Sequence, residues 1–151
     1  MAMPRFTLPI RQEQRNSALL ISPFEQDHRI LRSIFQEQGW SFFATRSLES
    51  ALAGLQRSAA SVIITERDLP AGNWKDVLDA MLCLPDAPLV VVTSLHADNY
   101  LWAEALNLGA YDVLSKPFDQ TEVIRVCNSA CMQHMRALPG KQRRHDERVP
   151  F

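Results

Sequence analysis

Several residue classes are scarce in this chain of 151 residues, and each scarcity excludes a class of protein. Cysteine occurs three times, at Cys83, Cys127 and Cys131, without framework spacing, which excludes a disulfide-stapled secreted domain and indicates free thiols in a reducing compartment. No purely aliphatic run exceeds four residues, and the N-terminus has no apolar signal core, so neither a membrane span nor export is expected. There is no glycine-rich phosphate loop, which argues against a nucleotide-binding site.

An excess of one charge is also missing, since 16 basic residues face 17 acidic ones for a net charge of −1. Residues 1–16 and 137–151 each carry +2, which leaves −5 on residues 17–136. A domain without a basic face is a poor nucleic-acid binder. We predict a flexible N-terminal arm (1–16), one folded domain (17–136) and a flexible basic tail (137–151). Because that tail is too short to fold into an output domain, we expect the domain to stand alone.

Between the arms, a short apolar run is followed by a helical pattern five times. The predicted strands are residues 18–21, 40–44, 61–65, 88–93 and 111–115, and the predicted helices are residues 27–38, 47–58, 74–82, 98–108 and 119–136. Strands that alternate with helices form a parallel sheet, and continuously apolar strands fit a sheet covered on both faces. We therefore predict an α/β domain whose site lies at the carboxyl ends of the strands.

Three short motifs stand at the ends of predicted strands. Asp68-Leu69-Pro70 follows the third strand, Val92-Thr93-Ser94 ends the fourth, and Lys116-Pro117-Phe118 ends the fifth. With these separations the chain resembles the receiver domain of two-component response regulators over residues 17–136. The resemblance implies a flavodoxin-like (CheY-like) fold, which is a doubly wound five-stranded parallel sheet in a single domain.

The resemblance also implies a site, and this chain departs from it. A typical receiver phosphorylates its own aspartate, and two acidic residues after the first strand help to hold Mg²⁺, which prefers hard oxygen ligands. Here the acidic pair falls on Ser22 and Pro23, and the phosphoacceptor falls on Glu66. The family's threonine and lysine are kept as Thr93 and Lys116. We therefore predict an atypical receiver that does not use aspartyl phosphorylation.

The expected output is contact with another signalling protein or with a second copy of the chain. The family's switch aromatic falls on Val113, whereas Tyr111, two residues earlier, is expected on the same face of the strand. On the fourth helix, Tyr100 and Trp102 are candidate interface residues together with Tyr111, because an exposed tryptophan is a frequent interface anchor. The alternative for Trp102 is a ring laid flat on its own helix.

Two interpretations of Glu66 and Lys116 remain open, since both follow strands of the same sheet. Their ion pair could imitate the phosphorylated state without a phosphate, or it could be a surface pair of about 0–1 kcal/mol with no role in switching. A rival function is a receiver that still phosphorylates itself with Mg²⁺ on an unusual acceptor, Glu66 or Asp68.

Two metal sites are conceivable from spacing alone. Glu25, Asp27, Glu66 and Asp68 could form a residual cation site, although Asp27 is equally a natural helix cap. Cys127, Cys131 and His134 share a helix face that could hold zinc, but a buried cysteine stripe explains them as well. We expect no metal, no cofactor and no enzymatic activity, and a cytoplasmic protein-interaction module.

Overall fold

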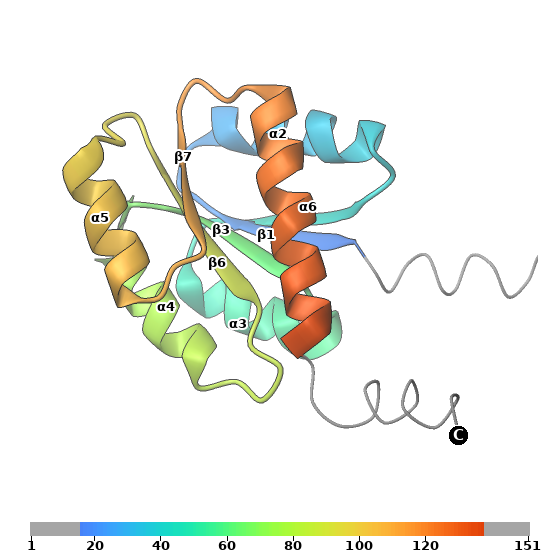
Figure 1. Cartoon of the computed structure of the whole chain (residues 1–151). Coiled ribbons are helices and arrows are strands. Elements are labelled where there is room, and N and C mark those ends of the chain that lie inside the picture. Colours follow the sequence, from blue (N-terminus) through green and yellow to red (C-terminus); the bar gives the residue numbers. More distant parts are fainter. Residues whose placement is uncertain (1–15, 138–151) are drawn as a thin grey trace, which may run out of the picture.

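Five apolar segments form one parallel sheet in the order β2-β1-β3-β6-β7, and a small antiparallel pair, β4-β5, lies beside it (Figure 1). The computed structural model describes residues 16–137, so the predicted arms lie outside the described residues except for positions 16 and 137. The strands are β1 (Ser17–Ile21), β2 (Ser41–Thr45), β3 (Val62–Glu66), β4 (Asp68–Leu69), β5 (Gly72–Asn73), β6 (Leu89–Ser94) and β7 (Asp112–Ser115). The helices are α2 (Glu25–Glu37), α3 (Leu48–Arg57), α4 (Trp74–Leu82), α5 (Asn99–Leu108) and α6 (Gln120–Ala137).

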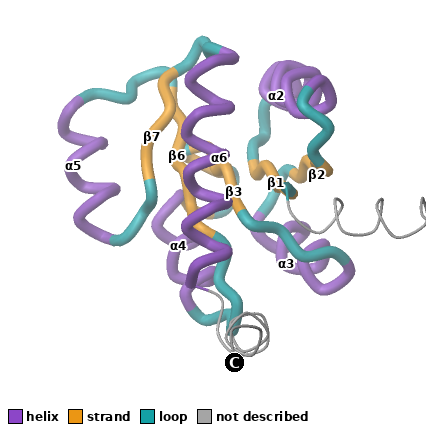
Figure 2. Tube along the Cα trace, turned by 45° about the vertical axis from the view of Figure 1, so that its right-hand side comes forward, coloured by secondary structure: helices purple, strands orange, loops and turns teal. Residues whose placement is uncertain are grey.

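The sheet is covered on both faces, which confirms the predicted doubly wound fold. Helices α2 and α6 pack on one face, where Phe35 of α2 meets Leu20 and Leu114 of the sheet. Helices α3, α4 and α5 pack on the other face, around Ile63 and Val92 (Figure 2). Because neither face meets water, β1 and β3 are buried along their whole length, and each contains an uninterrupted apolar run.

Polar caps explain most of the helix boundaries. The side chains of Ser47 and Asp98 accept hydrogen bonds from the backbone at the starts of α3 and α5. Asp119 does the same for α6, accepting from the amide of Glu122 at 2.9 Å. Asn73 and Asp76 form a reciprocal capping box at the start of α4. The predicted starts of these four helices therefore lie within one residue of the observed ones.

Two local predictions were wrong. Helix α2 begins at Glu25, and its N-cap residue Phe24 makes no side-chain cap, so Asp27 lies inside the first turn and is not the helix cap. No strand was predicted between residues 65 and 74, yet this segment folds into the β4-β5 pair, in which Asp68 faces Asn73. Both features depend on contacts with neighbouring elements, which periodicity does not reveal.

Candidate functional site

The parallel register of the strands brings four predicted site residues to one edge of the sheet. Glu66 is the last residue of β3 and is paired with Thr93 of β6. Ser22 directly follows β1, and Lys116 directly follows β7. The carboxyl ends of parallel strands meet at the same edge, where open α/β sheets place their sites. The structure thus places Ser22, Glu66, Thr93 and Lys116 at this edge.

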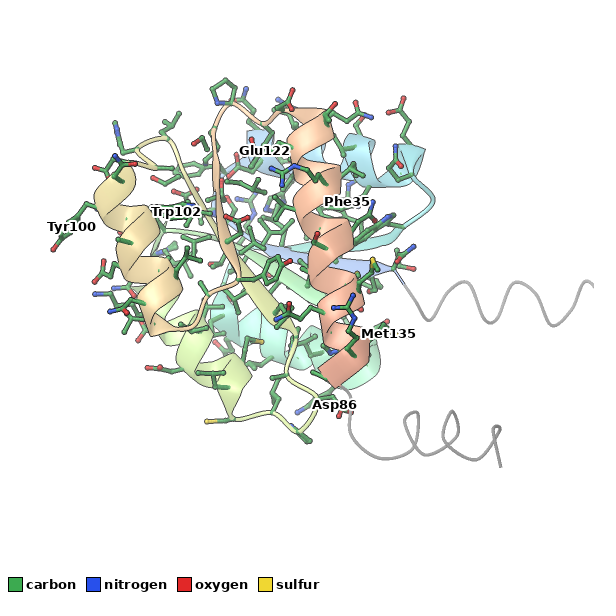
Figure 3. The ribbon with its side chains drawn as sticks, viewed as in Figure 1. Phe35, Asp86, Tyr100, Trp102, Glu122 and Met135 are labelled. Atoms are coloured by element: carbon green, nitrogen blue, oxygen red, sulfur yellow. The ribbon has the colours of Figure 1, made fainter. Side chains whose placement is uncertain are left out.

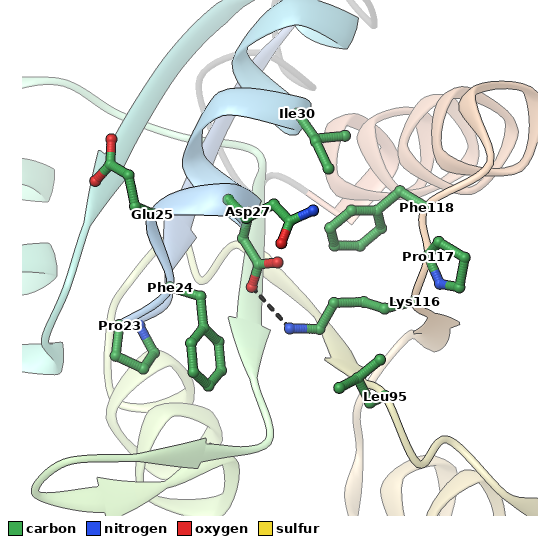
Figure 4. A pocket seen from close by; sticks show the side chains of 10 residues that line it. Pro23, Phe24, Glu25, Asp27, Ile30, Leu95, Lys116, Pro117 and Phe118 are labelled. Atoms are coloured by element: carbon green, nitrogen blue, oxygen red, sulfur yellow. Dashed lines mark hydrogen bonds and ion pairs between the residues drawn. The ribbon is translucent and has the colours of Figure 1, made fainter.

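Lys116 is the centre of this site. Its Nζ donates a hydrogen bond to Oδ2 of Asp27 at 2.8 Å and lies 2.7 Å from Oε1 of Glu66 in an ion pair. The side chain of Lys116 is 10% exposed, and those of Asp27 and Glu66 are 6% and 8% exposed. Figure 4 shows the lysine directed at Asp27 from the opposite wall of the pocket. Of the two interpretations of this pair, the surface ion pair is therefore wrong, because all three groups are withdrawn from water.

Sequence reasoning named Asp27 only as a candidate cation ligand or helix cap, and it missed the contact of this residue with Lys116. The first turn of α2 carries it to the site, and the hydroxyl of Ser22 donates a hydrogen bond to its Oδ2 at 2.8 Å. The same hydroxyl accepts from the amide of Phe24 at 3.0 Å, and Nε2 of His28 lies 2.8 Å from the carbonyl oxygen of Ser22. Ser22 therefore orients a carboxylate that α2 supplies. An acidic residue six positions after the end of a buried strand was the available signal.

Burial and charge oppose each other at this site. Burial raises the pKa of Glu66, and the hydrogen bond and charge of Lys116 offset that effect only in part. For Lys116, burial by itself lowers the pKa, but contact with Asp27 and Glu66 outweighs burial, so its pKa is raised. Lys116 is consequently a cation at neutral pH, fixed between two carboxyl groups.

The two predicted switch positions, Thr93 and Val113, are both buried. Oγ1 of Thr93 is buried and has no hydrogen-bond partner among residues 16–137. Val113 packs in the core beneath α3, α4 and α5, whereas Tyr111 packs against the core of α2 and α6 on the other face. The expectation that Tyr111 shares a face with Val113 is therefore wrong. Tyr111 precedes β7, which begins at Asp112, so the strand period does not extend to it.

The two aromatic interface candidates on α5 are exposed. Tyr100 is 80% exposed and Trp102 is 49% exposed, whereas Leu101 between them is buried against the sheet (Figure 3). Tyr111 is half-buried and packs against the core, so it offers less surface than the other two. Helix α5 thus presents two large aromatic side chains to the outside.

The four acids of the conceivable cation site do not come together. Glu25 pairs with Arg46 at 2.6 Å on the surface, and the 80% exposed side chain of Asp68 lies 3.8 Å from Arg67. Of these four acids, only Asp27 and Glu66 lie at the same place, and both contact Lys116. The Mg²⁺ site that the family implies does not fit these residues, because Pro23 offers no side-chain donor and an ammonium group already contacts both carboxylates.

The zinc candidates on α6 are likewise separated by burial. Cys127 and Cys131 are part of the core, and burial raises the pKa of Cys127 to about 12, which disfavours the thiolate that zinc requires. Nε2 of the partly exposed His134 lies 3.3 Å from the carbonyl oxygen of Asp86. Within residues 16–137, no three or more His, Cys, Asp or Glu side chains are grouped so that they could hold a metal ion.

A pocket of about 460 Å³ lies beside the site, between the start of α2 and the segment that follows β7 (Figure 4). Lys116 and Asp27 form its polar part, and the lysine Nζ lies 4.7 Å from the ring centroid of Phe24. Ile30, Leu95 and Phe118 supply apolar walls. The Lys116–Asp27 ion pair therefore forms part of the wall of a largely apolar depression.

Comparison with known proteins agrees with this architecture. The family model of the response regulator receiver domain matches residues 25–128, and the chain belongs to this family. It is 30% identical over 109 residues to the C4-dicarboxylate transport transcriptional regulatory protein DctD of Rhizobium meliloti, and the aligned region covers 69% of this chain and 24% of DctD. It is 28% identical over 122 residues to the response regulator protein FleR of Pseudomonas aeruginosa, covering 78% of this chain and 25% of FleR. The chain thus spans about a quarter of the length of these relatives.

Solved receiver structures share the fold. A putative response regulator from Chloroflexus aurantiacus superposes with a TM-score of 0.71 at 16% identity, covering 78% of this chain and 98% of that one. The beryllofluoride-activated NtrC4 receiver domain, solved as a dimer, gives a TM-score of 0.71 at 23% identity with the same coverage. In the described part of this chain, no helix has the length and apolar character needed to cross a bilayer.

Proposed function

We propose that this receiver domain is a phosphorylation-independent protein-interaction module in signal transduction. It is of an atypical kind, without the acidic pair and without the phosphoacceptor aspartate, whose positions hold Ser22, Pro23 and Glu66. We place it in the cytoplasm, where other signalling proteins are its partners, and we assign it no enzymatic activity.

One observation carries this proposal, namely the double contact of Lys116 with Asp27 and Glu66. In a typical receiver the lysine pairs with a phosphoryl group that arrives and leaves. Here two resident carboxylates already satisfy it, and burial protects both ion pairs from screening by salt. A site in this arrangement holds one charge state without a phosphate, which supports the interpretation of Glu66 as a permanent substitute for the phosphorylated form.

The surface proposed for contact is on α5, where Tyr100 and Trp102 are exposed on either side of the buried Leu101. Large aromatic side chains dominate the energetics of many protein interfaces. A second copy of the chain is the partner we propose for this surface, because two-fold pairs are the commonest oligomers. Another signalling protein is the alternative partner that would contact Tyr100 and Trp102.

The rival function is autophosphorylation with Mg²⁺ on an unusual acceptor. Thr93 and Lys116 are retained, and Asp68 is exposed near Glu66, which favours this rival. Against it, Glu66 is held by Lys116, and Asp68 lies beyond the end of β3 in the β4-β5 pair.

The two functions are separated by incubating the protein with Mg²⁺ and acetyl phosphate and measuring its intact mass over time. We expect no addition of a phosphoryl group and no change in the amide NMR spectrum, because no acceptor with a metal site is available. The variants Glu66→Gln and Asp68→Asn serve as controls. An adduct on the wild-type protein that either substitution removes would replace the proposed function by the rival.

A further inference from the structure

The two buried carboxylates at the site need a positive charge between them. Asp27 and Glu66 come from α2 and β3, and both side chains are less than 10% exposed. Two carboxylates that share a site repel each other and cannot both remain ionised without a compensating cation. The only cationic group that touches both, among the described residues, is the ammonium of Lys116.

We propose that the Lys116 ammonium is a built-in substitute for a divalent metal ion, and that removing it uncovers a divalent-cation site formed by Asp27 and Glu66. This inference rests on the proposed function and explains how such a site operates without Mg²⁺. In the unmodified protein the ammonium lies 2.8 Å from one carboxylate oxygen and 2.7 Å from the other, so a second cation would meet both repulsion and occupied ligands.

The surroundings of Lys116 offer the ligands that a hard cation prefers. Carboxylate oxygens of Asp27 and Glu66 are one set of donors. The hydroxyl oxygen of Thr93, which is buried and without a hydrogen-bond partner among residues 16–137, is the register partner of Glu66 in the neighbouring strand. The hydroxyl of Ser22 holds Asp27 in place from the other side. These groups remain when the lysine side chain loses its charge.

The test compares Lys116→Met with wild type in Mn²⁺ and no phosphodonor, following the melting temperature and the retained Mn²⁺ by electron paramagnetic resonance. Wild type should retain no Mn²⁺ and melt at an unchanged temperature. Lys116→Met should melt roughly 10 °C lower, because a buried pair loses its cation, and Mn²⁺ should restore much of that loss. Lys116→Arg, which keeps the charge, should retain no Mn²⁺.

Two further variants make the result specific. Lys75→Met is the matched control, because it breaks the more exposed pair between Lys75 and Glu104, at 2.8 Å, away from the site, and it should not respond to Mn²⁺. The double variant Asp27→Asn with Lys116→Met removes the repulsion together with a ligand. It should be more stable than Lys116→Met alone and should lose the retained Mn²⁺.

Two results would overturn the inference. One is that wild type retains Mn²⁺ as well as Lys116→Met does, and the other is that Lys116→Met folds without any response to Mn²⁺. If Lys116→Met does not fold, the wild-type amide signals of Asp27, Glu66 and Lys116 decide the matter, because paramagnetic broadening by Mn²⁺ would contradict an occupied site. A phosphoryl adduct, by contrast, would overturn the proposed function and not this cation exchange.

Discussion

Lys116 is held by two carboxylates that are far from it in the sequence, and their roles differ. Asp27 receives a hydrogen bond from Lys116 and another from Ser22, so its orientation is set on two sides. Among residues 16–137, Glu66 has the contact with Lys116 alone to offset its burial. At the scale of single residues, Asp27 is therefore the fixed counter-ion of Lys116, and Glu66 is the carboxyl group whose ionised form is disfavoured by burial.

The raised pKa of Glu66 predicts how its contribution to stability depends on pH. A carboxyl group whose pKa is raised on folding contributes stability that is fully present below its unfolded pKa of about 4.5 and is lost as pH rises through its folded pKa. The free energy of unfolding of wild type minus that of Glu66→Gln should therefore fall as pH rises above about 4.5. Urea unfolding at several pH values measures this difference.

The matched variant for that series is Asp68→Asn, which neutralises an exposed carboxylate two residues away. At neutral pH it should change the free energy of unfolding by no more than about 0.5 kcal/mol, as exposed substitutions usually do. If the difference between wild type and Glu66→Gln rises with pH instead, the attraction of Lys116 outweighs the burial of Glu66, and the assigned balance is wrong.

At the scale of elements, the β4-β5 pair and the start of α4 form one tightly joined unit. Gly72 has a φ of 134°, and a Cβ atom added there would lie 2.5 Å from Oδ2 of Asp76. That carboxylate accepts a hydrogen bond from the amide of Asn73 at 2.9 Å, so it has little freedom to move. Glycine is therefore required at this turn, beside the strand that carries Glu66.

Gly72→Ala should lower the free energy of unfolding by roughly 1–3 kcal/mol, because it imposes backbone strain and displaces the Asp76 cap. Gly54→Ala is the opposite case, since Gly54 lies inside α3 with a regular backbone and its added Cβ would rest 3.8 Å from Leu19. That substitution should stabilise the protein by roughly 0.5–1 kcal/mol. Thermal or urea unfolding of both variants checks the signs, and a stable Gly72→Ala protein would contradict the strained turn.

At the scale of the whole molecule, the charged site and the aromatic surface lie on different elements of one packed domain. Trp74 and Val113 belong to the same core as Leu101 of α5, so that core links the sheet to the helix that carries Trp102. Lys75 of α4 and Glu104 of α5 add an ion pair between the two helices. A change at the sheet edge could reach α5 through these contacts.

If α5 pairs two copies of the chain, Trp102→Ala should weaken self-association by at least roughly tenfold, as the loss of a central aromatic anchor does. Sedimentation at several protein concentrations measures the dissociation constant. Leu82→Ala is the control, because Leu82 on α4 is 61% exposed and is also apolar. Equal dissociation constants for wild type and Trp102→Ala would exclude this surface. The same measurement tests Glu66: if Glu66→Gln has the dissociation constant of wild type, Glu66 does not imitate the phosphorylated state.

Local patterns were sufficient for the order of the elements and for most of their boundaries. The alternation of apolar runs and helical periods determined a parallel sheet covered on both faces, and caps such as Ser47 and Asp98 act within three residues of themselves. Sequence spacing also determined that Glu66, Thr93 and Lys116 would follow strands of one sheet. These features need no knowledge of distant contacts.

Tertiary structure alone decided the content of the site. Asp27 and Lys116 are 89 residues apart, and their contact depends on α2 starting at Glu25, two residues earlier than its apolar period indicates. The burial of the ion pairs, the β4-β5 pair and the separate faces of Tyr111 and Val113 likewise follow from packing between elements. The sequence shows which side chains can carry a charge, but only the folded chain determines which groups lie close enough to compensate that charge.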